Sequence, residues 1–187
     1  MTGLVSVGYF LFSLVMSLVV FILWLRLILR YFRVSALHPV NQAVLAFTNP
    51  FIHPFTRLAP KQSRYDWVTL ALLVLVEMIK FFCIGWLLLG SVLSLPVILI
   101  YTVADLIIQP CNLLFYAILI RVLMSWINPG WPHPIKDILK LVTNPILRFS
   151  ARFTPNISGL DLSPVIALVC LEIITIFIRA SLPMHLL

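Results

Sequence analysis

The sequence predicts an all-α membrane protein with four transmembrane helices in two parallel repeats, each repeat carrying amphipathic interfacial helices in its loop. Three features lead to this prediction: an apolar composition, four long apolar segments and a duplication of the chain. Of the 187 residues, 62% are hydrophobic and only 10% are charged, whereas soluble domains contain about 25% charged residues. So few charges cannot cover a water-soluble surface, and much of the surface is therefore expected to face lipid.

Each of the four apolar segments is long enough to cross a bilayer, because ~20 helical residues span ~30 Å of hydrocarbon. They cover approximately residues 4–29, 67–89, 97–124 and 164–182. Their hydrophobicity is continuous rather than alternating, which favours helices over the strands of a membrane barrel. No positive charge precedes the first segment, where the first cation is Arg26. We therefore interpret this segment as a retained helix rather than a cleaved signal peptide.

The loops at residues 34–65 and 127–162 are not simply hydrophilic. In the second loop, apolar residues recur at helical spacing over residues 135–142, with lysines on the other side. Asn144 and Pro145 then predict the N-cap and first position of a second short helix. This pattern is typical of helices that lie in the membrane interface with their cations toward lipid phosphates.

An internal duplication becomes visible when the sequence is shifted by 95 residues, because the two loops then superimpose without a gap. We predict one repeat over residues 1–95 and a second over residues 96–187. The matched positions are Arg26 with Arg121, His38-Pro39 with His133-Pro134, Thr48-Asn49-Pro50 with Thr143-Asn144-Pro145, Asp66 with Asp161, and Glu77 with Glu172.

Topology follows from the repeat and from the distribution of cations. Each repeat has two spans, so the second repeat enters the membrane in the same direction as the first. Lysine and arginine concentrate in the two long loops. The positive-inside rule then places both loops in the cytoplasm and both termini on the periplasmic side of a bacterial inner membrane.

Charged residues within or next to the apolar segments are the first candidate site, since such residues usually face a bundle interior and pair. Lys80 lies ten residues before Gly90, and Asp105 lies nine residues after Pro96. At 1.5 Å per residue both are ~14–15 Å below the same membrane surface, so we expect them to form an ion pair. The full set is Arg26, Glu77, Lys80, Asp105, Arg121 and Glu172.

Two possibilities remain open for the glutamates: Glu77 shares Lys80 or reaches toward Arg26, and Glu172 reaches toward Arg121. The charges as a set also allow two interpretations. They either fix helix register by buried pairing, or they line a path for ions or protons.

Basic residues of the loops form the second candidate site, for anionic lipids or protein partners. The alternative is that they serve only as topology determinants. They are Arg57, Lys61, Lys136, Lys140, Arg148 and Arg152.

Other chemistries have little support in the sequence. His38, His53 and His133 each stand beside a proline and lack the cysteine or carboxylate cluster that a zinc site needs. The three cysteines lie in apolar segments without metal or redox spacing. We expect no cofactor, no metal, no nucleic-acid partner and no enzymatic activity.

The duplicated pattern of apolar helix, arginine, His-Pro, Thr-Asn-Pro, basic helix and aspartate resembles the YggT family. Residues 48–54 and 143–148 carry most of this resemblance, which covers essentially the whole chain. The family, also called YlmG-like, consists of small bacterial inner-membrane proteins with chloroplast relatives. The resemblance implies no catalytic activity. It implies roles in organising the envelope and division site, in assembling membrane complexes, or in tolerance of osmotic or ionic stress.

Two alternative functions are therefore expected. The first is a non-catalytic organiser of membrane or envelope complexes that acts through its basic interfacial helices. The second is a small ion channel or transporter component linked to osmotic or ionic stress. Mutual pairing of the mid-span charges favours the organiser, whereas a water-filled cavity shared by them favours transport.

Overall fold

The computed structural model describes residues 3–58, 66–90, 93–127, 133–153 and 162–183, and within these ranges every regular element is helical. Six are α-helices and one is a short 3₁₀-helix. They are α1 (Gly3–Tyr31), α2 (Pro39–Ile52), η1 (His53–Leu58), α3 (Trp67–Leu89), α4 (Leu95–Ile127), α5 (Pro134–Ser150) and α6 (Ser163–Ala180). The predicted all-α fold class is confirmed.

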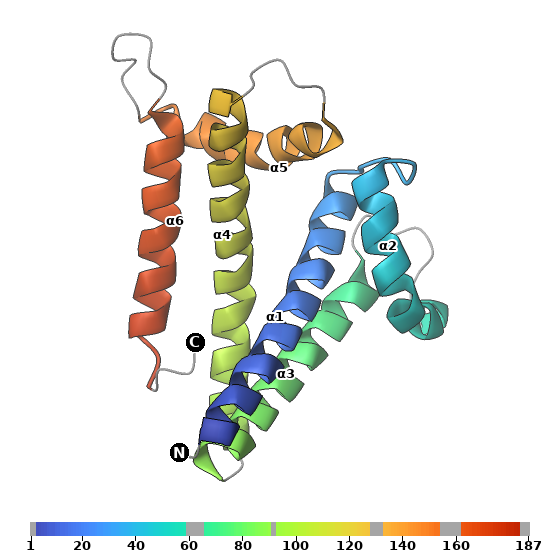
Figure 1. Cartoon of the computed structure of the whole chain (residues 1–187), viewed down its shortest axis with the longest axis vertical. Helices are drawn as coiled ribbons and strands as arrows, with labels where there is room; N and C mark the ends of the chain where they lie inside the picture. Colours follow the sequence, from blue (N-terminus) through green and yellow to red (C-terminus); the bar gives the residue numbers. More distant parts are fainter. Residues whose placement is uncertain (1–2, 59–65, 91–92, 128–132, 154–161, 184–187) are drawn as a thin grey trace.

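Four helices, α1, α3, α4 and α6, are long and apolar enough to cross a membrane. Their positions match the four segments expected from hydropathy, which confirms the predicted spans. Asp66 caps α3 by accepting a hydrogen bond from the backbone N–H of Thr69. Gly90 ends the same helix with a φ of 64°, a left-handed conformation that glycine adopts without strain. Helix α4 begins five residues after Gly90, packs against α3 and runs in the opposite direction (Figure 1).

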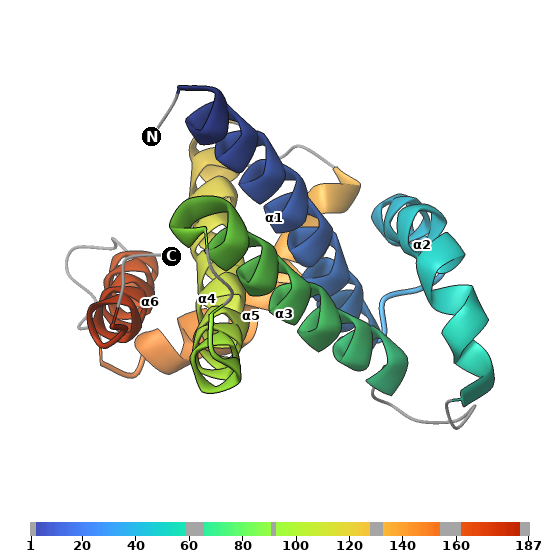
Figure 2. The same cartoon turned by 90° about the horizontal axis from the view of Figure 1, so that it is seen from below.

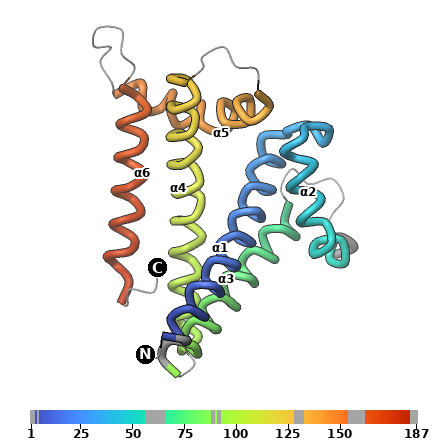
Figure 3. The backbone as a smooth tube through the Cα atoms, in the orientation of Figure 1, coloured from blue at the N-terminus to red at the C-terminus, as the bar shows by residue number. Residues whose placement is uncertain are grey.

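The two loop helices lie at the same end of the molecule. Figure 1 shows α5 lying across the ends of α4 and α6, while α2 leans against α1 at that end. The beginning of α1 and the end of α6 lie toward the opposite end (Figure 3). This arrangement has both long loops on one side, as the predicted parallel repeats require.

Each repeat has its own apolar core. In the first, Leu23 of α1 and Leu73 of α3 pack with Ile52 of the loop helix α2. In the second, Ile118 of α4 packs with Ala167 and Leu171 of α6, and residues of α5 join from the side. The α1–α3 pair is inclined to the α4–α6 pair (Figure 1). The two repeats thus use one packing scheme twice.

One sequence-based prediction is wrong. Asn144 and Pro145 do not begin a new helix, because α5 runs without interruption from Pro134 to Ser150. Asn144 lies inside this helix, whose N-cap is His133, and its side-chain oxygen accepts a hydrogen bond from Arg121. Pro50 lies inside α2 in the same way. Each proline removes one helical N–H donor, and side-chain contacts of the neighbouring residues hold the helix in place.

Candidate functional site

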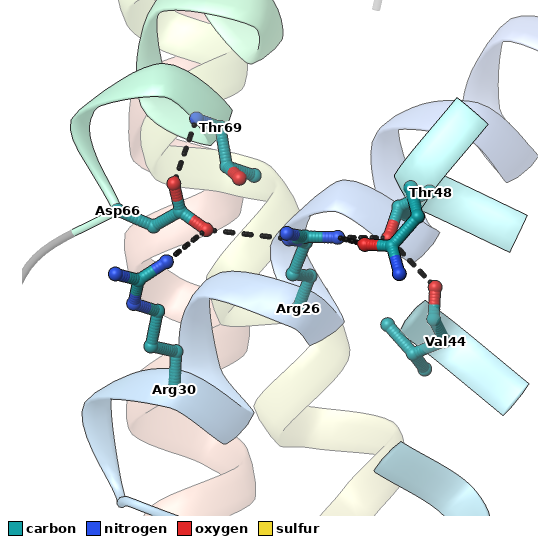
Figure 4. Close-up of polar contacts among 7 residues, drawn as sticks. Arg26, Arg30, Val44, Thr48, Asp66 and Thr69 are labelled. Carbon is teal, nitrogen blue, oxygen red and sulfur yellow. Dashed lines mark hydrogen bonds and ion pairs between the residues drawn. The ribbon is translucent and has the colours of Figure 1, made fainter. Parts of the chain in front are cut away.

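Arg26, near the end of α1, joins three elements of the first repeat (Figure 4). Its guanidinium is buried and donates from Nε to Asp66 Oδ2 at 3.2 Å. From Nη1 it donates to Thr48 Oγ1 at 2.5 Å and to Asn49 Oδ1 at 2.9 Å. One cation therefore ties α1 to the loop helix α2 and to the start of α3.

Nearby hydrogen bonds and an ion pair position the residues that accept from Arg26. The Thr48 hydroxyl donates to the Val44 carbonyl at 2.7 Å, one turn back in α2, which leaves its oxygen to accept from Arg26. Asp66 also accepts the Thr69 N–H, and Arg30 Nη1 lies 2.8 Å from Asp66 Oδ2. These residues are positioned by helix geometry rather than by a flexible loop.

Asp66 lies just outside the α3 span and is buried. Burial pushes the pKa of its carboxyl upward, but the Thr69 hydrogen bonds and the charges of Arg30 and Arg26 outweigh burial and hold the pKa below its usual value. Asp66 is therefore a negative charge held between two arginines and a helix N-terminus.

The second repeat builds the same arrangement 95 residues later. Arg121 Nη1 donates to Thr143 Oγ1 at 2.6 Å and to Asn144 Oδ1 at 2.7 Å. The Thr143 hydroxyl donates to the Leu139 carbonyl at 2.6 Å, as Thr48 does to Val44. The equivalent of Asp66, Asp161, lies outside the described residues. The arginine, threonine and asparagine of each repeat therefore form one recurring unit, here called the arginine clamp.

A second cluster lies at mid-span between α3 and α4. Lys80 Nζ lies 2.5 Å from Glu77 Oε2 and also donates to Asp105 Oδ2, and all three residues are buried. Gln109 Nε2 donates to both oxygens of Asp105 at 3.3 Å. The predicted pairing of Lys80 with Asp105 is confirmed. Because Lys80 and Asp105 belong to consecutive repeats, this cluster, the mid-span triad, joins the repeats.

The structure decides among the remaining pairings. Glu77 shares Lys80 and does not pair with Arg26, which is engaged by Asp66 and the loop motif. The expected reach of Glu172 toward Arg121 is wrong. Glu172 is exposed on α6, and Arg121 turns toward α5. The two arginines lie near the loop end of their spans, and the hydrogen-bond partners given above for them are residues of the loops and loop helices.

The structure describes the side chains of four of the six candidate loop cations. Lys140, Arg148 and Arg152 are exposed, and Lys136 is half-buried. Lys61 and the side chain of Arg57 lie outside the described residues.

The His-Pro pairs begin the loop helices: His38 and His133 are the N-cap residues, and Pro39 and Pro134 are the first helical positions. His133 Nδ1 accepts from the Ile135 N–H at 3.3 Å. Among the described residues, no group of three or more His, Cys, Asp or Glu side chains could hold a metal ion.

Sequence reasoning missed two participants. Gln109 was not singled out, although it lies one turn after Asp105 on the same helix face. Arg30, one turn after Arg26, was not singled out either. Arg26, Arg30 and Arg33 also line a cavity of about 430 Å³ together with Asp66 and Asn41. The i,i+4 spacing was the available signal in both cases.

A helical chain built in this way is a multi-span membrane protein with a duplicated two-span unit. It belongs to the CCB3/YggT family, whose model matches residues 5–87 and 99–182, one segment in each repeat.

Relatives of similar length support this assignment. The chain is 30% identical to YggT of Escherichia coli K12 over 165 residues, covering 88% of this chain and 85% of YggT. It is 28% identical to an uncharacterised protein of Pseudomonas aeruginosa over 186 residues, covering 97% of this chain and 93% of that protein. A relative from Vibrio alginolyticus is 29% identical over 164 residues, covering 87% of this chain and 88% of the relative. No solved structure matches the chain.

Proposed function

We propose that this protein is a non-catalytic organiser of membrane or envelope complexes in the bacterial inner membrane. Its basic interfacial helices bind anionic lipid and present a fixed surface to membrane or cytoplasmic partners. The observation that carries the proposal is the arginine clamp, which holds a loop helix against its span in both repeats. A loop that served only to connect two spans would not need a buried cation to fix its helix.

The side chains of α5 support binding at a lipid surface. Ile138 and Val142 are buried toward the protein. On the exposed part, Arg148 lies close in sequence to Phe149 and Phe153, whose rings pack 5.3 Å apart. Exposed aromatic rings beside cations are what an interfacial helix needs, since the rings enter the acyl boundary and the cations meet the phosphates.

Both loops face the cytoplasm in this proposal, and the termini are periplasmic. The support is the concentration of cations in the loops, which the positive-inside rule associates with the cytoplasmic side. The anionic phospholipids of the cytoplasmic leaflet then lie next to α2 and α5.

The mid-span charges support an organiser rather than a channel. Lys80 is shared by Glu77 and Asp105, and Arg26 is shared by Asp66 and the loop motif. Such mutual pairing fixes helices against each other. An ion route instead requires polar groups that are open to water at successive depths. No nucleophile–base arrangement was found in the sequence, which supports the non-catalytic assignment.

Lipid preference of the full chain tests the proposal. Proteoliposomes with spin-labelled phosphatidylglycerol and phosphatidylcholine report the preference of the lipid shell for the anionic lipid. We expect Arg148→Gln with Arg152→Gln to lower this preference, because each cation near the surface contributes ~1 kcal/mol. Arg179→Gln is the matched control. Arg179 is also exposed but lies at the other end of α6, and because this change removes one cation rather than two, we expect a smaller change.

Two outcomes would contradict the organiser. One is an anionic-lipid preference that is unchanged by the double substitution. The other is ion flux through proteoliposomes of the unaltered chain above that of protein-free vesicles, which would favour the channel. A membrane partner cross-linked to the unaltered chain in native membranes, but not to the double variant, would support the organiser further.

A further inference from the structure

The four spans form an open row rather than a closed bundle. Within the described residues, α6 packs on α4, α4 packs on α3, and α3 packs on α1, with a smaller contact between α1 and α4. Helix α6 makes no comparable contact with α1 or α3. Figures 1 and 2 show α6 on one side of α4 and the α1–α3 pair on the other. The row therefore has two ends, α6 and α1.

The most extensive contact between the repeats is that of α3 with α4, beside smaller contacts of α1 with α4 and of α2 with α5. It is here called the junction. On α3, Phe81 and Ile84 are 0% and 3% exposed, and they pack with Ile98 and Tyr101 of α4. The rings of Phe81 and Tyr101 lie 5.5 Å apart. The mid-span triad belongs to this same junction, and so the junction combines apolar packing with buried charge.

The residues equivalent to the two sides of this junction lie at the ends of the row, on α6 and α1, and there they are exposed. On α6, the equivalents of Glu77, Phe81 and Ile84 are Glu172, Ile176 and Arg179, and all three are exposed. On α1, the equivalents of Tyr101, Thr102 and Asp105 are Ser6, Val7 and Phe10, and these are also exposed. Ile176 and Phe10 are 57% and 60% exposed, where Phe81 and Asp105 are 0% and 1%.

Glu172 gives an independent reason to expect a protein on the α6 face. It lies nine residues after Ser163 and eight before Ala180, about 12–14 Å from either end of the span. In the part of the chain that the structure describes, no hydrogen bond or ion pair reaches its carboxylate. The contact at this residue is that of its backbone carbonyl, which accepts from Thr175. A carboxylate in the middle of hydrocarbon is costly, and such residues usually face protein.

We infer that α6 of one copy docks on α1 of a second copy, and that this contact reproduces between chains the junction that α3 and α4 form within the chain. Direction supports a second copy as the occupant. Copies inserted in the same orientation place α6 antiparallel to the neighbouring α1, as α3 is to α4. A head-to-tail contact of this kind leaves no end uncovered when copies close into a ring.

Depth supports the same occupant. Ser13 is the α1 equivalent of the buried Ile108 and lies ten residues from Gly3, about 15 Å into the span. Glu172 lies about 12 Å from the same membrane surface. The Ser13 hydroxyl, which donates to the Phe10 carbonyl within the chain, can turn to donate to the carboxylate of the neighbouring copy. The inference does not depend on lipid binding by the loop helices.

Cysteine cross-linking in native membranes tests the inference. Two differently tagged copies of the full chain, with Cys83, Cys111 and Cys170 replaced by serine, are expressed together. One carries Ser6→Cys and the other Ile176→Cys, the equivalents of the contacting pair Tyr101 and Phe81. We expect a short thiol cross-linker to join the two tags. Replacing the second variant by Ile174→Cys is the control, because Ile174 is exposed at similar depth on another face of α6.

Single-molecule photobleaching of membrane-derived particles gives a second measurement. Ile176→Trp should lower the fraction of particles with more than one copy, and Ile174→Trp should not. Both positions are exposed, so neither substitution disturbs the fold of one chain. Equal cross-linking at Ile174 and Ile176, particles with one copy only, or a different membrane protein cross-linked at Ile176 in place of the second copy would each overturn the inference.

Discussion

The two repeats share the arginine clamp but differ at mid-span. In both, an arginine near the end of the first helix donates to a threonine and an asparagine of the loop helix. At mid-span, the first repeat contributes Glu77 and Lys80 to a buried triad, whereas the second has an exposed Glu172 and a buried Thr175 at the equivalent positions.

This difference separates two tasks. Fixing the loop helix is needed in every repeat, and the residues that do so are duplicated. Joining one repeat to the next is needed once within the chain, and the charges that do so, Lys80 and Asp105, have no charged counterpart 95 residues away. Features shared by the repeats thus belong to the unit, and features found in one repeat belong to the junction.

The largest expected effect separates Lys80 from its counterpart Thr175. Lys80→Gln leaves two buried carboxyl groups without their cation, and breaking a buried pair from one side costs about 3–5 kcal/mol. Thr175→Val removes one hydroxyl that donates to a backbone carbonyl, a loss of about 1 kcal/mol. The free energy of unfolding of the full chain, measured by steric trapping in bicelles, gives both values. Similar losses of unfolding free energy for the two variants would contradict the proposed difference between Lys80 and Thr175.

The arginine clamp predicts matched effects in the two repeats. Hydrogen bonds from a charged group contribute about 1.5–3 kcal/mol, so Arg26→Gln and Arg121→Gln should each release a loop helix. Hydrogen exchange resolved by peptide should show faster exchange in α2 for the first variant and in α5 for the second. Faster exchange throughout the chain in either case would mean that the arginine stabilises the spans rather than the loop helix.

A smaller pair of effects concerns the threonines. Thr48→Val and Thr143→Val keep the shape of the side chain and remove the oxygen that accepts from arginine. Each should lower the free energy of unfolding by about 1–2 kcal/mol, since the arginine loses one of its acceptors. Near-equal values are expected because the local geometry is the same. Losses that differ by more than the measurement error would show that the two clamps are not equivalent.

The smallest expected effect is a pH dependence in the first repeat. The pKa of Asp66 is lowered in the folded chain, so the folded state binds its proton less readily than the unfolded state. Stability from Asp66 is therefore present above the usual aspartate pKa of about 4 and is lost as pH falls through the lowered value. Unfolding free energies measured from neutral to acid pH should show this loss, and Asp66→Asn should remove that component. If Asp66→Asn left the pH dependence of the unfolding free energy unchanged, the assigned role of Asp66 would be contradicted.

Much of the architecture could be predicted from the sequence because lipid imposes simple constraints. Continuous apolar segments located all four spans, and the 95-residue shift located both loop motifs. Equal depth on antiparallel helices was enough to predict the pairing of Lys80 with Asp105.

The remaining contacts depend on the directions in which side chains point, and residue spacing does not give these directions. Pro145 predicted a helix start, because the sequence did not reveal that the Asn144 side chain accepts from Arg121. Glu172 was expected to face the bundle, as buried acids usually do. It lies on the exposed face of α6 because that face meets no other span of the same chain.

The central claim is that the mid-span charges fasten the first repeat to the second, and a charge-swap cycle tests it most directly. Lys80→Asp and Asp105→Lys are made singly and together in the full chain, and the amount of folded protein in the membrane and its free energy of unfolding are measured. Because the two side chains pair with each other, we predict that each single change is strongly destabilising and that the double swap restores part of the loss. A double swap no more stable than the worse single variant would contradict the claim.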